Sequence, residues 1–313
     1  MSAPAFRSIA LLGLNRHLQA TGNLGSKILA ALNNAGFSVT AIQRAESKNV
    51  ANGAAKSIKV DLTSESGLIN AFKGQDVVVS ATPNPVLATE KIWMDAAVSA
   101  GVKRIVLSEY STNMDNEKSK TLPIIYDKLQ TRKYAEKLGS SGKIGWSSVN
   151  NGPFFVPFIW TAGWMGANVQ TKTALFHDGG DKIVCTSTLE RIGETVAKIL
   201  APEHAADTEN KPIYTYSAAV SERKITDIVS KITGINFPVT SASVEEITKE
   251  AFAAVAKGDN SRNMAFYIPF CWGDGYGGDF RDQAWNEKLG LKEMSDVEIE
   301  ELFRGFLSKN AAN

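Results

Sequence analysis

Two short stretches near the start of the chain decide its fold: FRSIALLG at residues 6–13 and TGNLGSKILAAL at residues 21–32. The first is an apolar run that ends in glycine, which predicts a buried strand. The second opens with a glycine turn and continues as an amphipathic helix. A strand, a glycine turn and a helix in this order let the backbone approach an anion and aim helix N–H groups at it. The two stretches therefore predict a dinucleotide-binding loop.

The loop between these stretches carries six extra residues, Leu14–Gln19, with the sequence LNRHLQ. Without them the chain would read GATGNLG, which has the spacing G-x-x-G-x-x-G of a phosphate-binding loop. Three arrangements of the hexapeptide are open. It bulges outward and leaves the loop intact, it folds inward and adds Arg16 as a phosphate ligand, or it occupies the place of the cofactor. Cofactor binding therefore depends on this segment.

The first half of the chain alternates short strands rich in Val and Ile with helices that each end at a glycine. The predicted strands are Ile9–Gly13, Ser38–Gln43, Ser57–Asp61, Asp76–Ala81 and Arg104–Ser108, and the predicted helices are Asn23–Ala35, Ser64–Phe72 and Thr89–Ala100. This order is typical of an α/β protein with a Rossmann-like, doubly wound parallel sheet. A further helix from Pro123 to Leu138 and a strand over Gly145–Val149 continue the pattern.

The second half of the chain mixes short strands with helices and shows no internal repeat. Apolar runs at Lys182–Cys185 and Ile213–Tyr216 predict strands, and Ser295 with Glu298 fits a capping box at the start of the last helix. We expect an NAD(P)-binding Rossmann domain at residues 1–160. A smaller α/β region at residues 161–313 is expected to pack on it and to cover the substrate.

The composition of the 313 residues is that of a globular protein, with 43% hydrophobic residues, 21% charged residues and a net charge of +1. A charge this close to zero gives no electrostatic reason to expect nucleic acid or a membrane as partner. Neither a secretory signal nor an apolar run of membrane-spanning length is evident. The two cysteines are far apart in sequence, and neither they nor the three histidines have metal-ligand spacing. We expect a cytoplasmic protein without a metal.

Several local sequences occur together in this chain: ATGNLGSKIL at 20–29, VTAIQR at 39–44, DVVVSATPNP at 76–85, AAVSAGVKRIVLSEYSTNMD at 96–115, YDKLQTRKYAEK at 126–137 and NNGPFF at 150–155. Their combination resembles the NmrA-like and isoflavone reductase-like family of atypical short-chain dehydrogenases. The resemblance covers residues 6–160 well and continues more weakly to the end. It implies an NADP(H)-binding fold and, in many members, hydride transfer to a small aromatic or conjugated substrate.

The resemblance assigns the three glycines of the phosphate loop to Gly13, Gly22 and Gly25. An acidic residue at the end of the second strand would favour NAD, whereas Arg44 stands there and its guanidinium can pair with the 2′-phosphate of NADP. Ligands of such sheets lie at the carboxyl ends of the strands, where Thr82 and Pro83 follow the fourth strand. The predicted cofactor-binding residues are Gly13, Thr21, Gly22, Asn23, Leu24, Gly25, Arg44, Lys48, Thr82, Pro83, Lys128, Asn151, Pro153 and Phe154.

The Tyr-x-x-x-Lys pair of the typical short-chain dehydrogenases does not occur in this sequence. Lys128 instead matches the lysine of the isoflavone reductase-like enzymes. On its predicted helix it shares a stripe with Thr131 and Ala135, so we expect it to face the protein, where burial disfavours the charged form. The resemblance implies that Lys128 is a general acid or base during hydride transfer. Glu109 either orients a catalytic group or caps a turn.

Three functions follow from these observations. The leading one is an NADPH-dependent reductase of a conjugated, aromatic small molecule in secondary metabolism. The second is a regulatory or redox-sensing protein of the NmrA type, which binds the dinucleotide without chemistry and engages a partner protein through its surface. The third is a cofactor-independent, non-redox enzyme, an isomerase or cyclase, and it follows if Leu14–Gln19 fills the cofactor site.

Overall fold

The computed structural model describes residues 6–13, 22–48, 51–83, 86–156 and 164–311. It divides into two compact units, and each is built from segments that are distant in sequence. Unit 1 comprises Met1–Tyr110, Tyr126–Asn150 and Leu189–Ile213, and unit 2 comprises Ser111–Ile125, Asn151–Thr188 and Tyr214–Asn313.

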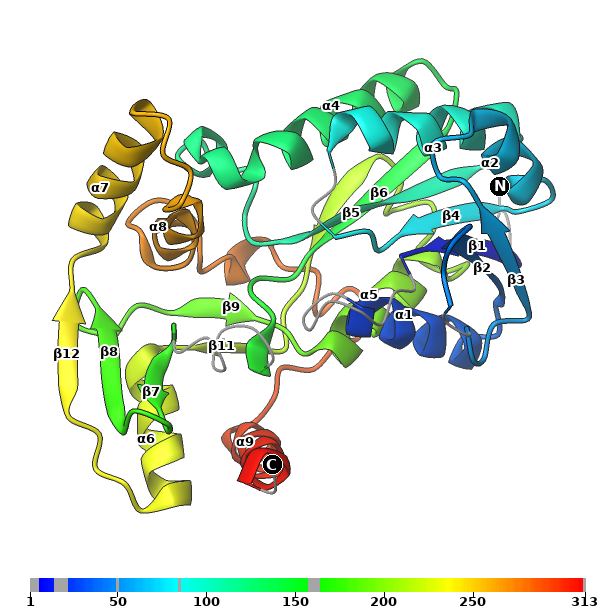
Figure 1. The fold of residues 1–313 in the computed structure, drawn as a ribbon. Helices are drawn as coiled ribbons and strands as arrows, with labels where there is room; N and C mark the ends of the chain where they lie inside the picture. Colours follow the sequence, from blue (N-terminus) through cyan, green and yellow to red (C-terminus); the bar gives the residue numbers. More distant parts are fainter. Residues whose placement is uncertain (1–5, 14–21, 49–50, 84–85, 157–163, 312–313) are drawn as a thin grey trace. The chain divides into compact units, whose positions relative to one another are not determined.

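Unit 1 is built on a sheet in which seven strands lie within the described residues, in the order β10-β6-β5-β4-β1-β2-β3 (Figure 1). The strands are β1 (Ser8–Leu12), β2 (Ser38–Arg44), β3 (Lys56–Val60), β4 (Val77–Ser80), β5 (Arg104–Ser111), β6 (Gly145–Asn150) and β10 (Lys211–Tyr214). The pairings β1–β2, β1–β4, β2–β3 and β4–β5 are parallel. The chain builds β1, β2 and β3 in one direction and then returns to place β4 on the other side of β1. This arrangement confirms the predicted doubly wound α/β fold.

Helices cover both faces of this sheet, as Figure 1 shows. On one face lie α1 (Gly22–Asn34) and α5 (Leu189–Leu200), and on the other lie α2 (Glu65–Phe72), α3 (Leu87–Ser99) and α4 (Tyr126–Ser140). The backbones of α1 and α5 come close because α5 carries Gly193 at the contact: a Cβ there would meet the carbonyl oxygen of Lys27 at 2.6 Å. Since both faces are covered, β1 and β4 are apolar and buried almost throughout.

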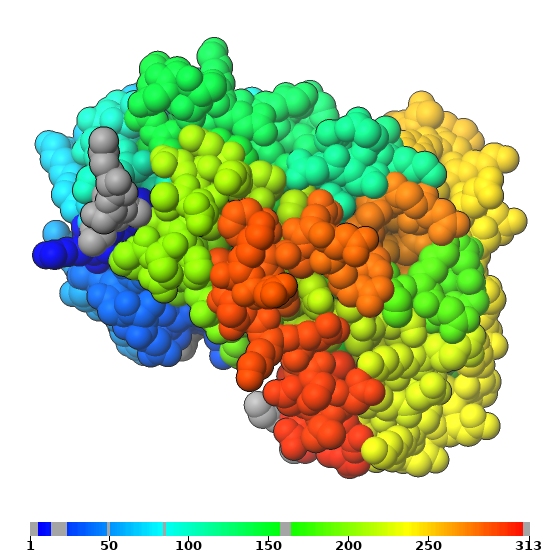
Figure 2. All heavy atoms as spheres, turned by 180° about the vertical axis from the view of Figure 1, so that it is seen from behind, coloured from blue at the N-terminus to red at the C-terminus, as the bar shows by residue number. Residues whose placement is uncertain are grey.

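The segment between α5 and β10 lies at the surface of unit 1, where Figure 2 shows it in yellow-green against the green residues of α4. The backbone N–H of Asn210 donates to the carbonyl oxygen of Trp146 at 2.6 Å, and its side-chain oxygen accepts from the N–H of Trp146 at 3.2 Å. These bonds tie the segment to β6, so the chain continues into β10 at the edge of the sheet.

Unit 2 contains a three-stranded sheet in the order β12-β8-β7 and an antiparallel pair, β9 with β11, among its described residues. Its strands are β7 (Gly166–Asn168), β8 (Thr173–His177), β9 (Val184–Thr186), β11 (Ala218–Val220) and β12 (Val239–Ala242). Its helices are α6 (Glu222–Thr233), α7 (Val244–Ala256), α8 (Tyr267–Trp272) and α9 (Asp296–Ala311), with 3₁₀ turns η1 (Ser119–Thr121), η2 (Pro123–Ile125), η4 (Asn263–Phe266) and η5 (Arg281–Gln283). An apolar core that includes Phe155, Trp272 and Phe303 holds these elements together.

The capping box expected before the last helix is confirmed. Glu298 Oε2 accepts from the backbone N–H of Ser295 at 2.7 Å, and the N–H of Glu298 donates back to the Ser295 hydroxyl at 3.3 Å. The reciprocal bonds satisfy two donors that the helix itself leaves unpaired.

The structural units differ from the expected division at residue 160. Leu189–Ile213 returns to unit 1, because α5 packs against α1 and β10 joins the edge of the large sheet, whereas Ser111–Ile125 belongs to unit 2. The strand expected at Ile213–Tyr216 corresponds to β10, which begins two residues earlier and lies in the Rossmann sheet. The helix expected from Pro123 begins as the 3₁₀ turn η2, and α4 itself starts at Tyr126.

Candidate functional site

The carboxyl end of β1 is where the sheet of unit 1 changes direction, and Gly13 stands there with φ of +94°. A Cβ at this position would lie 2.3 Å from the carbonyl oxygen of Ala81, which follows β4. Any other residue would push the ends of β1 and β4 apart and would also be strained by the positive φ. Crevices at such switch points hold ligands in open α/β sheets. Gly13 therefore lets the ends of β1 and β4 lie close together at this switch point.

Helix α1 begins directly after the residues that the structure leaves out. Gly22, Asn23, Leu24 and Gly25 form its first turn, and Leu24 is buried. This turn carries no acidic side chain, so the N–H groups that a helix leaves unpaired at its start, and the helix dipole, can act on an anion. Thr21 and the hexapeptide Leu14–Gln19 lie outside the described residues, and all three arrangements of the hexapeptide stay open.

Of the two cations predicted to select NADP, Arg44 is the last residue of β2 and Lys48 follows the strand. Arg44 and Lys48 are both exposed, and the guanidinium Nε of Arg44 lies 3.3 Å from Oε1 of Glu46. An exposed ion pair of this kind is weak and can open. Gln43, just before, is buried and accepts a hydrogen bond from the hydroxyl of Ser57 at 2.8 Å.

The loop after β4 is fixed by a chain of side-chain hydrogen bonds. The hydroxyls of Ser80 and Thr82 lie 3.0 Å apart. From β5, Ser108 donates to the carbonyl oxygen of Thr82 at 2.7 Å, and the Tyr110 hydroxyl donates to the carbonyl oxygen of Ser80 at 3.0 Å. Thr82 and Pro83 are half-buried, so each keeps some surface in contact with solvent. The predicted cofactor loop is thus held in one conformation from the side of β5.

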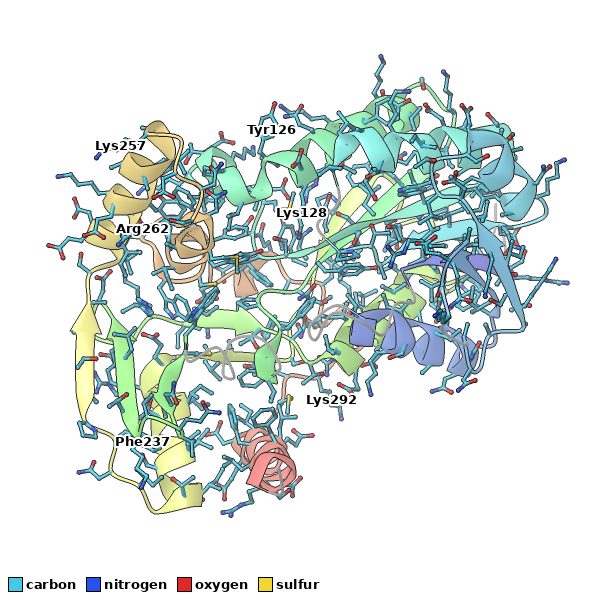
Figure 3. All side chains as sticks on the ribbon, in the orientation of Figure 1. Tyr126, Lys128, Phe237, Lys257, Arg262 and Lys292 are labelled. Atoms are coloured by element: carbon cyan, nitrogen blue, oxygen red, sulfur yellow. The ribbon has the colours of Figure 1, made fainter. Side chains whose placement is uncertain are left out.

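Lys128 belongs to the first turn of α4 and is half-buried. Figure 3 shows Lys128 and the exposed Tyr126 on opposite sides of the helix. The Lys128 ammonium group donates to the backbone carbonyl oxygen of Glu109, near the end of β5. Burial lowers the pKa of Lys128 to about 8, although the charge of Glu109 acts in the opposite direction. A lysine with such a pKa exchanges protons near neutral pH.

A buried ionic cluster around the Glu109 side chain lies next to the carbonyl group that Lys128 binds. The carboxylate of Glu109, 1% exposed, accepts hydrogen bonds from Arg132 Nε at 2.7 Å and from Asn150 Nδ2 at 3.0 Å, and it also contacts the second guanidinium nitrogen, Nη2. Although burial raises the pKa of Glu109, the charge and hydrogen bonds of Arg132 outweigh it and hold that pKa below its ordinary value. Glu109 is therefore an anion, and its backbone carbonyl is held where Lys128 binds it.

The remaining predicted residues, Asn151, Pro153 and Phe154, belong to unit 2. The N–H of Asn151 donates to the carbonyl oxygen of Ser111 at 2.8 Å, and the carbonyl oxygen of Pro153 accepts from Ser187 at 3.2 Å. Phe154 forms an isolated bridge with Ser187. Their role in cofactor binding stays a prediction.

The sequence did not predict that two charged side chains, one on α4 and one on α3, are buried. Arg132 stands in the cationic helical sequence KLQTRK, which suggests an exposed face, yet it is 3% exposed. Glu90 stands in the first turn of α3, where an acidic residue is commonplace, yet it is 2% exposed and bonded to Thr82. One feature of the sequence could have indicated that Arg132 is buried: Glu109 stands in an otherwise apolar strand, and a buried carboxylate needs a partner.

A family model of the NmrA-like family matches residues 18–306 of this chain. The chain belongs to the NmrA-like family. The oxidoreductase aprR of Aspergillus flavus is 31% identical over 291 residues, which cover 90% of this chain and 95% of that protein. These findings confirm the resemblance and place the chain among the oxidoreductases of the NmrA-like family.

Solved structures with the same fold include AtPrR2 with NADP+ and (+)pinoresinol, with a TM-score of 0.72, 18% identity and coverage of 96% of this chain and 99% of that one. A crystal structure of isoflavone reductase has a TM-score of 0.73 at 16% identity and covers 95% of this chain and 99% of that one. In the part of this NmrA-like chain that the structure describes, no helix has the length and apolar character needed to cross a membrane.

Proposed function

We propose that this protein is an NADPH-dependent reductase of a small, conjugated, aromatic substrate formed in secondary metabolism, with Lys128 as its catalytic residue. The observation that carries the proposal is the position of Lys128, half-buried and bound to the carbonyl oxygen of Glu109 at the end of β5. Gly13 and Thr82 follow β1 and β4, and β4 lies between β1 and β5 in the same sheet. The name oxidoreductase of the relative from Aspergillus flavus supports the reaction class.

The described residues fit a bound dinucleotide. Gly13 presents no side chain at the end of β1, and the first turn of α1 would offer a pyrophosphate its N–H groups without a competing acid. Arg44 and Lys48 would hold the 2′-phosphate, and Thr82 and Pro83 would border the nicotinamide ribose. When bound, NADPH supplies a hydride to the substrate.

Lys128 manages the proton of the reaction. With a pKa of about 8 it is largely protonated at neutral pH, and it can donate a proton to a carbonyl or phenol oxygen of the substrate. The carbonyl oxygen of Glu109 accepts one N–H of the ammonium group and so orients the others. The Glu109–Arg132 ion pair fixes that carbonyl, so the position of the acid does not depend on a mobile side chain.

Replacing Lys128 by Met tests the proposal in an NADPH oxidation assay with enones and quinone methides as probes. We expect kcat to fall at least about 100-fold, the usual contribution of a general acid. In the unaltered protein kcat falls as pH rises through about 8, because Lys128 then loses its proton. Lys133→Met, an exposed lysine on the same helix, is the matched control and keeps full activity.

The outcomes separate the three functions. Full turnover by Lys128→Met overturns the role of the lysine. Tight NADPH binding without turnover of any probe, together with recovery of a partner protein, replaces the reductase by the regulatory function. A calorimetric titration without heat at millimolar NADPH replaces it by the cofactor-independent function.

A further inference from the structure

A buried carboxyl group lies beneath the loop that follows β4. Glu90 is the acidic residue of the first turn of α3, and it is 2% exposed. An acidic side chain at this end of a helix is normally stabilised by the helix N–H groups while it remains in water. Glu90 is instead withdrawn into unit 1, so another contact must account for its position.

That contact is with the predicted cofactor loop. The hydroxyl of Thr82 donates to Glu90 Oε1 at 3.1 Å, and the same hydroxyl lies 3.0 Å from that of Ser80. The bonds from Ser108 and Tyr110 hold the loop from β5, whereas Glu90 holds it from α3. Glu90 is therefore the contact through which α3 fixes the side chain of Thr82.

No cation neutralises this carboxyl group among the described residues. Its second oxygen, Oε2, has no hydrogen-bond donor there. The cations on the neighbouring helices have other partners: Lys91 forms an ion pair within α3, and Lys128 and Arg132 of α4 both bind Glu109. A buried carboxyl group without a counter-ion favours its neutral form.

The remaining titratable groups around Glu90 do not change this balance. On β5, Tyr110 is buried and its own pKa is raised by burial and by the charges of Glu109 and Glu90. Glu65 of α2 and Lys73, which follows that helix, are exposed. Burial raises the pKa of Glu90 to about 7, and the nearby indole of Trp93 and the hydroxyl of Thr82 only partly oppose it.

We propose that Glu90 is a positioning residue that holds the Thr82–Pro83 loop ready for the cofactor as a neutral carboxylic acid, and that its ionisation weakens cofactor binding. This inference rests on the proposed function, in which Thr82 and Pro83 border the nicotinamide ribose. Ionisation acts through charge: the carboxylate still accepts the hydrogen bond of Thr82, but it places a negative charge beneath a site that receives an anionic dinucleotide.

The test is the dissociation constant of NADPH, measured by fluorescence titration between pH 6 and pH 8.5. For the unaltered protein we expect the affinity to fall about fivefold over this range, the low end of coupling between interacting sites. Glu90→Gln, a neutral isostere, shows a smaller fall in affinity over this range, because Lys128 still titrates there whereas the amide does not. Glu90→Ala binds weakly at every pH, because the loop has lost its support. Glu65→Gln, which changes an exposed glutamate in the first turn of α2, behaves as the unaltered protein.

A purely structural role of Glu90 would leave the pH dependence the same in Glu90→Gln and in the unaltered protein, and that result overturns the inference alone. In turnover, the effect belongs in KM for NADPH, and a change confined to kcat also overturns it. Absence of NADPH binding by the unaltered protein at every pH overturns the proposed function and this inference together.

Discussion

Glu90 of α3 and Glu109 of β5 are two buried carboxyl groups whose pKa values are shifted in opposite directions. Each is at most 2% exposed, and each influences the pKa of Tyr110. Yet the pKa of Glu90 is raised to about 7, while that of Glu109 lies below its ordinary value. With equal burial, Glu90 is therefore readily protonated near neutral pH, whereas Glu109 is an anion.

The partners make the difference. Glu109 accepts hydrogen bonds from the guanidinium of Arg132 and from the amide of Asn150, which replace the lost hydration of its charge. Glu90 has the single hydroxyl of Thr82 on one oxygen and no donor on the other among the described residues. The comparison shows that the partners of a buried carboxyl group, and not its depth, decide its charge.

The largest effect on stability is expected when Glu109, like Glu90, has no cation beside it. Arg132→Met leaves a buried anion without its counter-ion and lowers the free energy of unfolding by about 3–5 kcal/mol. Urea-induced unfolding followed by circular dichroism measures this loss. The double variant Arg132→Met with Glu109→Gln recovers most of it, because no buried charge is left unpaired.

Lys133→Met serves as the matched control for Arg132→Met, since it removes an exposed cation from the next position of α4. It is expected to change stability by less than about 0.5 kcal/mol. An Arg132→Met variant as stable as this control would contradict the ionic character of the Glu109 cluster.

The second effect concerns the sign of the pH dependence. Because the folded-state pKa of Glu90 lies at about 7, above the ordinary carboxyl value of 4.5, ionisation costs stability as pH rises between these values. Glu90→Gln removes that cost, so its stability relative to the unaltered protein increases by at most about 3 kcal/mol between pH 4.5 and pH 8. Thermal unfolding in a series of buffers follows the difference, and a difference independent of pH would refute the raised pKa.

Glu109 behaves in the opposite way. Since its folded-state pKa is lowered, the stability it contributes is present above the ordinary carboxyl pKa and is lost as pH falls through the folded-state value. Acid unfolding of Glu109→Gln is therefore less steep than that of the unaltered protein.

The smallest effect is expected at the exposed pair of Arg44 and Glu46, whose side chains are 55% and 70% exposed. Here water already stabilises both charges, so Glu46→Gln changes the free energy of unfolding by less than about 1 kcal/mol. Chemical denaturation at low and high salt gives the value. If Glu46→Gln lowered the free energy of unfolding as much as Arg132→Met, buried and exposed ion pairs would not differ in their contribution to stability.

Local sequence patterns predicted most of the fold of unit 1. The period of the apolar residues and the glycines after each helix placed β1 to β6 and α1 to α4 with small shifts at their ends. They did not place β10 in the sheet, because a four-residue strand at an edge carries little pattern and its neighbour β6 is distant in sequence. Lys128 was selected by the family resemblance, and helical spacing alone left it as one cation among several.

The sequence by itself determined the order of strands and helices, the glycine turn at the start of α1 and the family, since these depend on residues close together in the chain. Only the tertiary structure decided which charged groups are buried and which partners they find. Glu109 meets Arg132 from 23 residues away and Asn150 from 41 residues away, whereas Glu90 meets a hydroxyl. The charge of a buried group depends on such distant neighbours, and therefore no local pattern can reveal it.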